Sequence, residues 1–64
     1  MWDIINEIRR QQTMSGYQIV QYCHTVLGRN GYFAGACIAR ALQYGHIHII
    51  GTTFVNAKRY NIYA

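Results

Sequence analysis

Few side chains in this chain of 64 residues could bind a metal ion or act as a nucleophile. Cys23, Cys37, His46 and His48 are of zinc-ligand type, but there is no Cys-x-x-Cys pair and no standard histidine spacing. Cys23 lies directly before His24, and adjacent side chains on a helix point about 100° apart, so these two cannot form a nucleophile and its base. We therefore expect no metal ion and no cofactor.

Groups for acid–base catalysis are also scarce. The acidic residues are Asp3 and Glu7, and no later carboxylate exists to orient a base or to act as an acid. We therefore expect no enzyme and no small-molecule substrate. The first residues do not resemble a secretory signal, and Arg40 interrupts the longest apolar run before it could span a membrane. These features predict a cytoplasmic protein with reduced, buried cysteines.

The charged residues are distributed unevenly along the chain. The formal net charge is +4 and the isoelectric point is near 9.4. From residue 8 to residue 64 there are six bases and no acid: Arg9, Arg10, Arg29, Arg40, Lys58 and Arg59. This distribution favours a polyanionic partner, with nucleic acid ahead of a membrane surface. The alternative is that the charge serves solubility alone.

Three helices are predicted within one domain, residues 1–64. The first covers residues 2–12, with Trp2 as a core anchor. The second follows a capping box of Ser15 and Gln18 and runs to about residue 27. The third and central helix lies between an N-cap at Asn30 and a glycine stop at Gly45. Its apolar stripe consists mostly of small residues: Ala34, Cys37, Ile38, Ala41 and Leu42.

The remaining chain predicts a two-stranded hairpin. Residues 46–49 alternate strictly, which would point Ile47 and Ile49 towards the core. Residues 59–63 alternate again, with Tyr60 and Ile62 pointing inward. The connecting loop is expected at residues 51–58, although the first strand could extend and place the turn at Asn56-Ala57 instead.

This order of elements resembles the winged helix-turn-helix family, in particular small phage and bacterial transcription regulators. The matching segments are SGYQIV (15–20) at the start of the second helix, Leu27-Gly28 at the turn, IARALQYGHI (38–47) at the end of the third helix, and RYNI (59–62) in the closing strand. The resemblance implies an α+β, mostly helical fold of three helices with a C-terminal two-stranded wing. The sequence departs from the family in two ways. Its second helix and turn are about one helical turn longer than in the compact members of the family, and its third helix is poor in the polar side chains that read bases.

The resemblance also implies a DNA-binding surface. It places helix 31–44 in the major groove, with base contacts at Asn30, Tyr32, Phe33, Ala36 and Arg40. The bases that fit phosphate contacts are Arg29, beside the N-terminus of that helix, and Lys58 and Arg59 in a wing at 51–59 that reaches the backbone or minor groove.

Three functions follow as hypotheses. The first is a small DNA-binding regulator on double-stranded DNA, located at the nucleoid and acting as a homodimer or beside a partner protein. The second is a protein-interaction module, such as an inhibitor or an assembly subunit, which would use the same helix as a docking face. The third, a membrane-surface binder, is disfavoured because no exposed basic amphipathic helix is evident.

Overall fold

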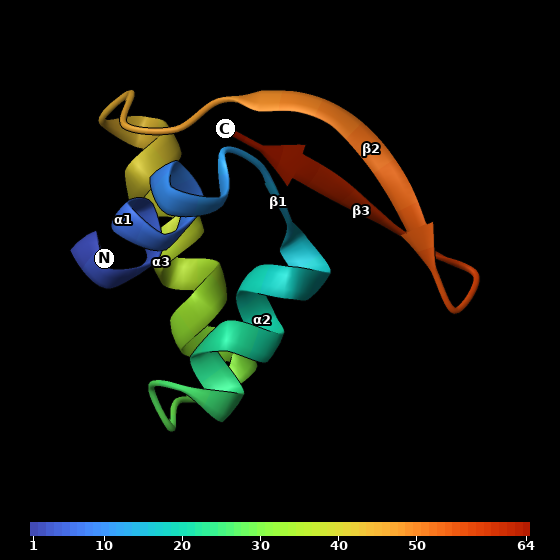
Figure 1. The fold of residues 1–64 in the computed structure, drawn as a ribbon, viewed down its shortest axis with the longest axis horizontal. Coiled ribbons are helices and arrows are strands. Elements are labelled where there is room, and N and C mark those ends of the chain that lie inside the picture. The colour runs from blue at the N-terminus through green and yellow to red at the C-terminus, as the bar shows by residue number, and fades with distance from the viewer.

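A computed structural model describes all 64 residues as three helices and three strands (Figure 1). In chain order they are α1 (Trp2–Gln11), β1 (Met14–Ser15), α2 (Gly16–Thr25), α3 (Gly31–Gln43), β2 (Ile49–Val55) and β3 (Lys58–Tyr63). The fold is α+β, with about half of the residues in helices, as the sequence predicts. The three predicted helices are all present, and their ends differ from the predicted ends by one or two residues.

Helix α1 covers the core with one isoleucine-rich side. Ile4, Ile5 and Ile8 are almost completely buried. Trp2 is 49% exposed, so the prediction that it anchors the core is wrong. Its indole lies on the outside of α1 against His46, with the ring centroids 4.6 Å apart.

Helix α2 begins with the predicted capping box. The Ser15 hydroxyl accepts from the Gln18 backbone N–H at 3.1 Å, and the Gln18 side-chain oxygen accepts from the Ser15 N–H at 2.8 Å. These bonds satisfy two backbone donors at the point where the chain leaves β1. Ile19 and Cys23 follow at a spacing of four and are fully buried.

Helix α3 is bounded by the two predicted signals. The Asn30 side chain accepts from the Phe33 N–H at 3.0 Å. At the other end Gly45 has φ 74°, and the N–H groups of Gly45 and His46 donate to Leu42 and Ala41, which is a Schellman ending. The small buried residues Ala34 and Ala41 let α3 pack closely against its neighbours.

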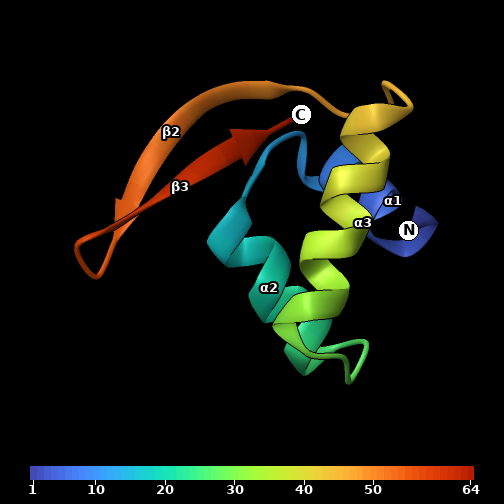
Figure 2. The ribbon, with the colours of Figure 1, turned by 180° about the vertical axis from the view of Figure 1, so that it is seen from behind.

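The sheet has three antiparallel strands in the order β1-β3-β2, not the two strands that the sequence predicts (Figures 1 and 2). The extra strand β1 pairs Met14 with Tyr63 and Ser15 with Ile62. Tyr63 and Met14 are buried, so this pairing ties the end of the chain to the helical core.

The sequence predicts a first strand over residues 46–49, and this position is wrong. The N–H groups of His46 and Ile47 donate to the Ala41 carbonyl at the end of α3, so they cannot begin a strand ladder. Strand β2 starts at Ile49, which is 52% exposed instead of pointing into the core, whereas Ile47 is buried as predicted. Tyr60 and Ile62 are half-buried.

The predicted loop over residues 51–58 is also wrong. The alternative, a longer first strand with the turn at Asn56-Ala57, is confirmed. Val55 pairs with Lys58 across a two-residue turn at Asn56 and Ala57, whose φ values are 52° and 64°. Phe54 and Val55 are therefore strand residues. The hairpin of β2 and β3 curves away from the helices and ends in this turn (Figure 1).

Candidate nucleic-acid interface

The outer face of α3 carries three of the eight residues that the sequence assigns to DNA contacts. Tyr32, Ala36 and Arg40 follow one another at a spacing of four, so they form one row along the helix. All three are exposed, and Tyr32 has 90% of its surface accessible. In Figure 2, α3 lies in front of α1, and no other element lies between α3 and the viewer.

Two of the predicted residues, Arg29 and Asn30, lie at the N-terminus of α3. The Arg29 guanidinium lies over the Phe33 ring, 4.2 Å from its centroid. This contact keeps an exposed cation beside the helix N-terminus, where backbone N–H groups favour an anion. The oxygen of the Asn30 side chain is used by the helix cap, so only its NH2 group is free to donate to a ligand.

A shallow hollow of about 260 Å³ lies beside this row. Phe33, Ala36, Cys37 and Arg40 line it from α3, and Met1 lines it from the start of the chain. The hollow is mostly apolar, with Arg40 as its charged member. The structure therefore brings Arg29, Phe33, Ala36 and Arg40 together on one surface.

Lys58 and Arg59 lie apart from that surface. They are at the turn end of the hairpin, and α2 stands between the hairpin and α3 in both ribbon views (Figures 1 and 2). Successive strand residues point to opposite faces, so the two cations do not act on one face together. The Lys58 ammonium lies 5.4 Å from the Tyr60 ring centroid, whereas Arg59 is opposite Phe54 on the other face.

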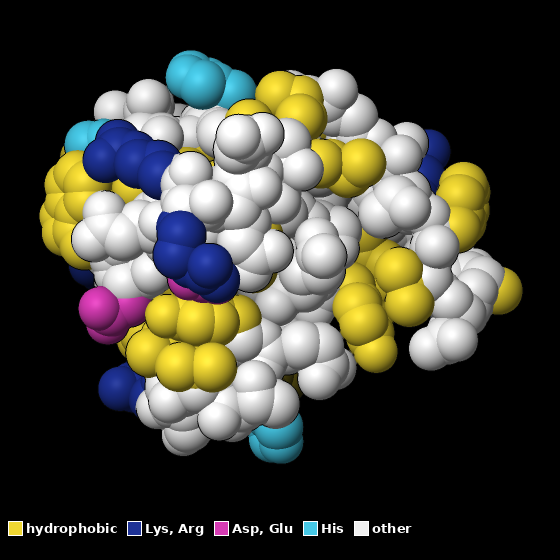
Figure 3. All heavy atoms as spheres, viewed as in Figure 1, with side chains coloured by type: hydrophobic (Ala, Val, Ile, Leu, Met, Phe, Trp, Pro, Cys, Tyr) yellow, Lys and Arg dark blue, Asp and Glu magenta, His cyan; other side chains and the backbone are white.

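Both acidic residues, Asp3 and Glu7, lie on α1. The Arg10 guanidinium donates to Glu7 at 2.8 Å through Nε, and Gln11 donates to the same carboxylate. These hydrogen bonds lower the pKa of Glu7 to about 2. On the face shown in Figure 3 the acidic side chains lie among basic ones on the α1 side, and none lies over the hairpin.

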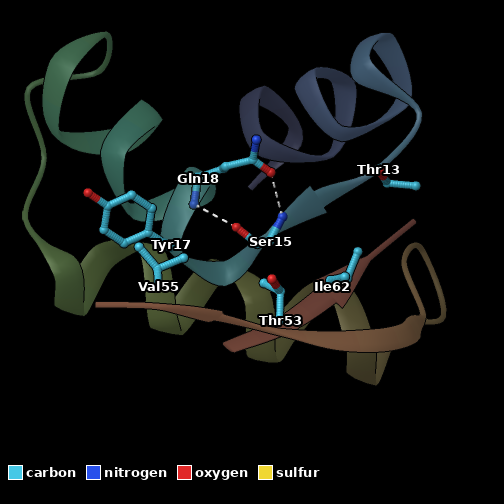
Figure 4. A pocket seen from close by; sticks show the side chains of 7 residues that line it. All are labelled: Thr13, Ser15, Tyr17, Gln18, Thr53, Val55 and Ile62. Atoms are coloured by element: carbon cyan, nitrogen blue, oxygen red, sulfur yellow. Dashed lines mark hydrogen bonds between the residues drawn. The ribbon is translucent and has the colours of Figure 1, made fainter. Parts of the chain in front are cut away.

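A second hollow of about 440 Å³ was not foreseen from the sequence (Figure 4). It lies between the start of α2 and the inner face of the hairpin, and its lining is uncharged: Thr13, Ser15, Tyr17, Gln18, Thr53, Val55 and Ile62. The Ser15 hydroxyl and the Gln18 carbonyl already bond to the backbone. No pattern in the sequence predicts this hollow, because it depends on where the hairpin curls.

The sequence also did not reveal an aromatic cluster at the end of α3. His46 lies between Trp2 and Tyr44, and the Arg9 guanidinium is 5.6 Å from the Trp2 ring centroid. Trp2 and Tyr44 remain about half exposed or more.

The cysteines and histidines do not assemble into a metal site. Cys23 and Cys37 are both free thiols in the core, and burial raises the pKa of Cys23. No three metal-ligating side chains lie close enough to hold an ion. None of the helices has the length and apolar character needed to cross a bilayer.

Comparison with models of known families, with curated proteins and with solved structures finds no match for this chain.

Proposed function

We propose that the protein is a small DNA-binding regulator of winged-helix type, with α3 in the major groove and the hairpin on the neighbouring backbone or minor groove. The order of helices and the three-stranded antiparallel sheet with its hairpin support this arrangement. The longest dimension of the molecule, 29 Å, is shorter than one turn of B-DNA, which is about 34 Å. A single domain could thus contact a groove and the adjacent backbone.

The observation that carries the proposal is the separation of charges. Four exposed bases lie on or beside α3 and the hairpin, namely Arg29, Arg40, Lys58 and Arg59. No acidic residue lies on either element, because Asp3 and Glu7 are both on α1. A phosphate backbone that approaches α3 and the hairpin therefore meets bases, and no acid, on the two elements themselves.

The chemistry of α3 suggests how bases would be contacted. Arg40 can donate two hydrogen bonds to guanine, and Ala36 allows close approach to a thymine methyl group. Arg29, held over Phe33, would contact a phosphate together with the backbone N–H groups of the helix N-terminus. Few of these groups read sequence, so most of the affinity would come from phosphates.

Charge-removing variants test the proposal. Arg29→Gln, Arg40→Gln and the double variant K58Q/R59Q are each titrated against fluorescent duplex DNA, and affinity is measured by anisotropy. Each is expected to lose about fivefold or more in affinity, since one phosphate or base contact contributes roughly 1 kcal/mol or more.

Arg9→Gln is the matched control, because it removes the same charge from α1. It is expected to change affinity less than the three test variants do. Losses that depend only on the number of charges removed, with Arg9→Gln losing as much as Arg29→Gln and Arg40→Gln, would mean that only net charge matters and would contradict the proposed surface.

One observation favours a second function, a protein-interaction module that docks through α3. The hollow beside Arg40 is mostly apolar, and Tyr32 projects beyond it with 90% exposure. Exposed aromatic residues beside an apolar hollow are typical of protein interfaces. An α3 surface of this kind would bind its partner with weak salt dependence, whereas DNA binding would fall steeply with salt.

A further inference from the structure

Strand β2 forms an edge of the sheet that is open along its whole length. The strand order β1-β3-β2 leaves the outer side of β2 without a hydrogen-bonding neighbour (Figure 1). Its sequence, IIGTTFV, contains no charged residue and no proline. Edge strands usually carry such residues to prevent pairing with another chain. The one feature of β2 that hinders pairing with another chain is a bulge between Ile49 and Gly51 at its start.

The register defines which backbone groups are free. The two-residue turn makes Val55 and Lys58 the closing hydrogen-bonded pair of the hairpin. Hydrogen-bonded and non-hydrogen-bonded pairs alternate in an antiparallel ladder, so Thr53 also bonds to β3. The N–H and C=O groups of Thr52 and Phe54 therefore point outward, away from β3.

The side chains along this edge are exposed and apolar. Ile50 is 55% exposed and Phe54 is 69% exposed. Figure 3 shows hydrophobic side chains exposed over the half of the molecule that contains the hairpin. Free backbone groups and exposed apolar side chains thus occur on the same strand, and this combination favours addition of another strand.

We propose that β2 pairs antiparallel with β2 of a second copy, which joins the two sheets into one of six strands about a two-fold axis. The centre of the seven-residue strand is Thr52, which would lie opposite the Thr52 of the second copy. Phe54 would then lie opposite the second copy's Ile50, so the exposed apolar side chains become cross-strand neighbours.

Charge and geometry both fit a second copy as the occupant. Because β2 is uncharged, the pairing places no like charges opposite one another. The antiparallel arrangement directs the two turns, with Lys58 and Arg59, to opposite ends of the joint sheet.

The pairing would stop at two copies. The other edge of the sheet is β1, which has two residues, Met14 and Ser15, that are both buried. Because both copies would use the same strand about a two-fold axis, the contact is isologous and closes at two copies instead of growing into a fibre.

Sedimentation equilibrium without DNA tests the proposal independently of any nucleic-acid binding. The average mass is expected to rise from 7.4 kDa towards twice that value as the protein concentration increases to the millimolar range. Over the same range, hydrogen exchange at the Thr52 and Phe54 amides should slow, while exchange at exposed loop amides stays constant. A monomer at all concentrations, or larger open-ended aggregates, would overturn the proposal.

Charge substitutions at Thr52 identify the surface. Thr52→Lys and Thr52→Glu each place like charges at the two-fold axis, and each is expected to weaken dimerisation at least about tenfold. A mixture of the two variants should dimerise again, because the opposed charges then attract. Thr25→Lys, on the exposed end of α2, is the control and should dimerise as the unmodified chain does.

Circular dichroism of each variant confirms that it is folded before its mass is measured. A dimer dissociation constant for Thr52→Lys equal to that of the unmodified chain would contradict pairing through β2. A mixture of Thr52→Lys and Thr52→Glu that stays monomeric would contradict it as well.

Discussion

Asn30 is the residue where the stability of α3 and the binding of an anion can be separated. Its side-chain oxygen caps the helix, and its position beside Arg29 places it at the proposed phosphate contact. Asp is as good an N-cap as Asn and adds a charge that the helix N-terminus favours. The same charge repels phosphate.

Asn30→Asp is therefore expected to keep the free energy of unfolding or to raise it by up to about 0.5 kcal/mol. Affinity for DNA should fall by about fivefold or more at low salt. Urea denaturation and anisotropy measure the two quantities on the same protein. A variant that is equally stable and binds DNA with unchanged affinity would remove the N-terminus of α3 from the interface.

The two cysteines differ in how a reagent can reach them. Cys23 is completely buried and its pKa is raised, whereas Cys37 borders the hollow beside Phe33. Because both thiols are buried, both should react slowly with a thiol reagent in the native protein. Cys37 should react first, since Cys23 is the more deeply buried and its raised pKa disfavours the reactive thiolate. Mass spectrometry after timed labelling measures the order, and Cys37→Ala isolates the reaction of Cys23. Faster labelling of Cys23 would contradict the packing of α2 against α3.

At the scale of elements, the turn of the hairpin stores strain that can be removed. Ala57 has φ 64°, a left-handed conformation that costs a residue with a Cβ about 1 kcal/mol or more. Asn-Gly is the favoured sequence for a turn of this type. Ala57→Gly is expected to raise the free energy of unfolding by about 0.5 to 1 kcal/mol in urea denaturation.

A matched control for this change is Ala39→Gly, which places glycine in the exposed middle of α3 and should destabilise by about 1 kcal/mol. Loss of stability in Ala57→Gly as well would show that the turn does not have the conformation described here.

The helices could be predicted from the sequence because their ends are local. The capping box at Ser15, the N-cap at Asn30 and the glycine at Gly45 each involve residues that are close in the chain. Strand β1 could not be predicted in this way. It has two residues and exists only because Met14 meets Tyr63 from the far end of the chain.

The sequence predicts a strand that starts at His46, whereas β2 starts at Ile49, because a strand pattern and a helix ending overlap at these residues. Residues 46–49 alternate as a strand does, but the helix ending takes the N–H groups of His46 and Ile47. His48 then pairs with Ala64 through two backbone hydrogen bonds, which no local pattern reveals. For the candidate site, the family resemblance implies DNA contacts at Phe33, Ala36 and Arg40, and these three residues line one hollow in the structure. The opposite directions of Lys58 and Arg59 depend on the position of the turn, which the sequence left open.

In the whole molecule, the bases of α3 and the bases of the hairpin together predict how binding depends on salt. The bases on α3 and on the hairpin are separated by α2, so a protein that uses both must contact DNA at two places. Binding should then release counterions from both contacts. A protein that uses only the apolar hollow beside Arg40 would release few.

The most direct test is the salt dependence of binding to mixed-sequence duplex DNA, measured by fluorescence anisotropy. If the protein binds DNA through these bases, log K falls linearly with log salt, with a slope of about −3 or steeper, which corresponds to three or more phosphate contacts. Removing Arg29 should reduce the slope by about one. No binding at low salt, or a slope near zero, would contradict DNA binding and leave α3 as a protein-docking surface.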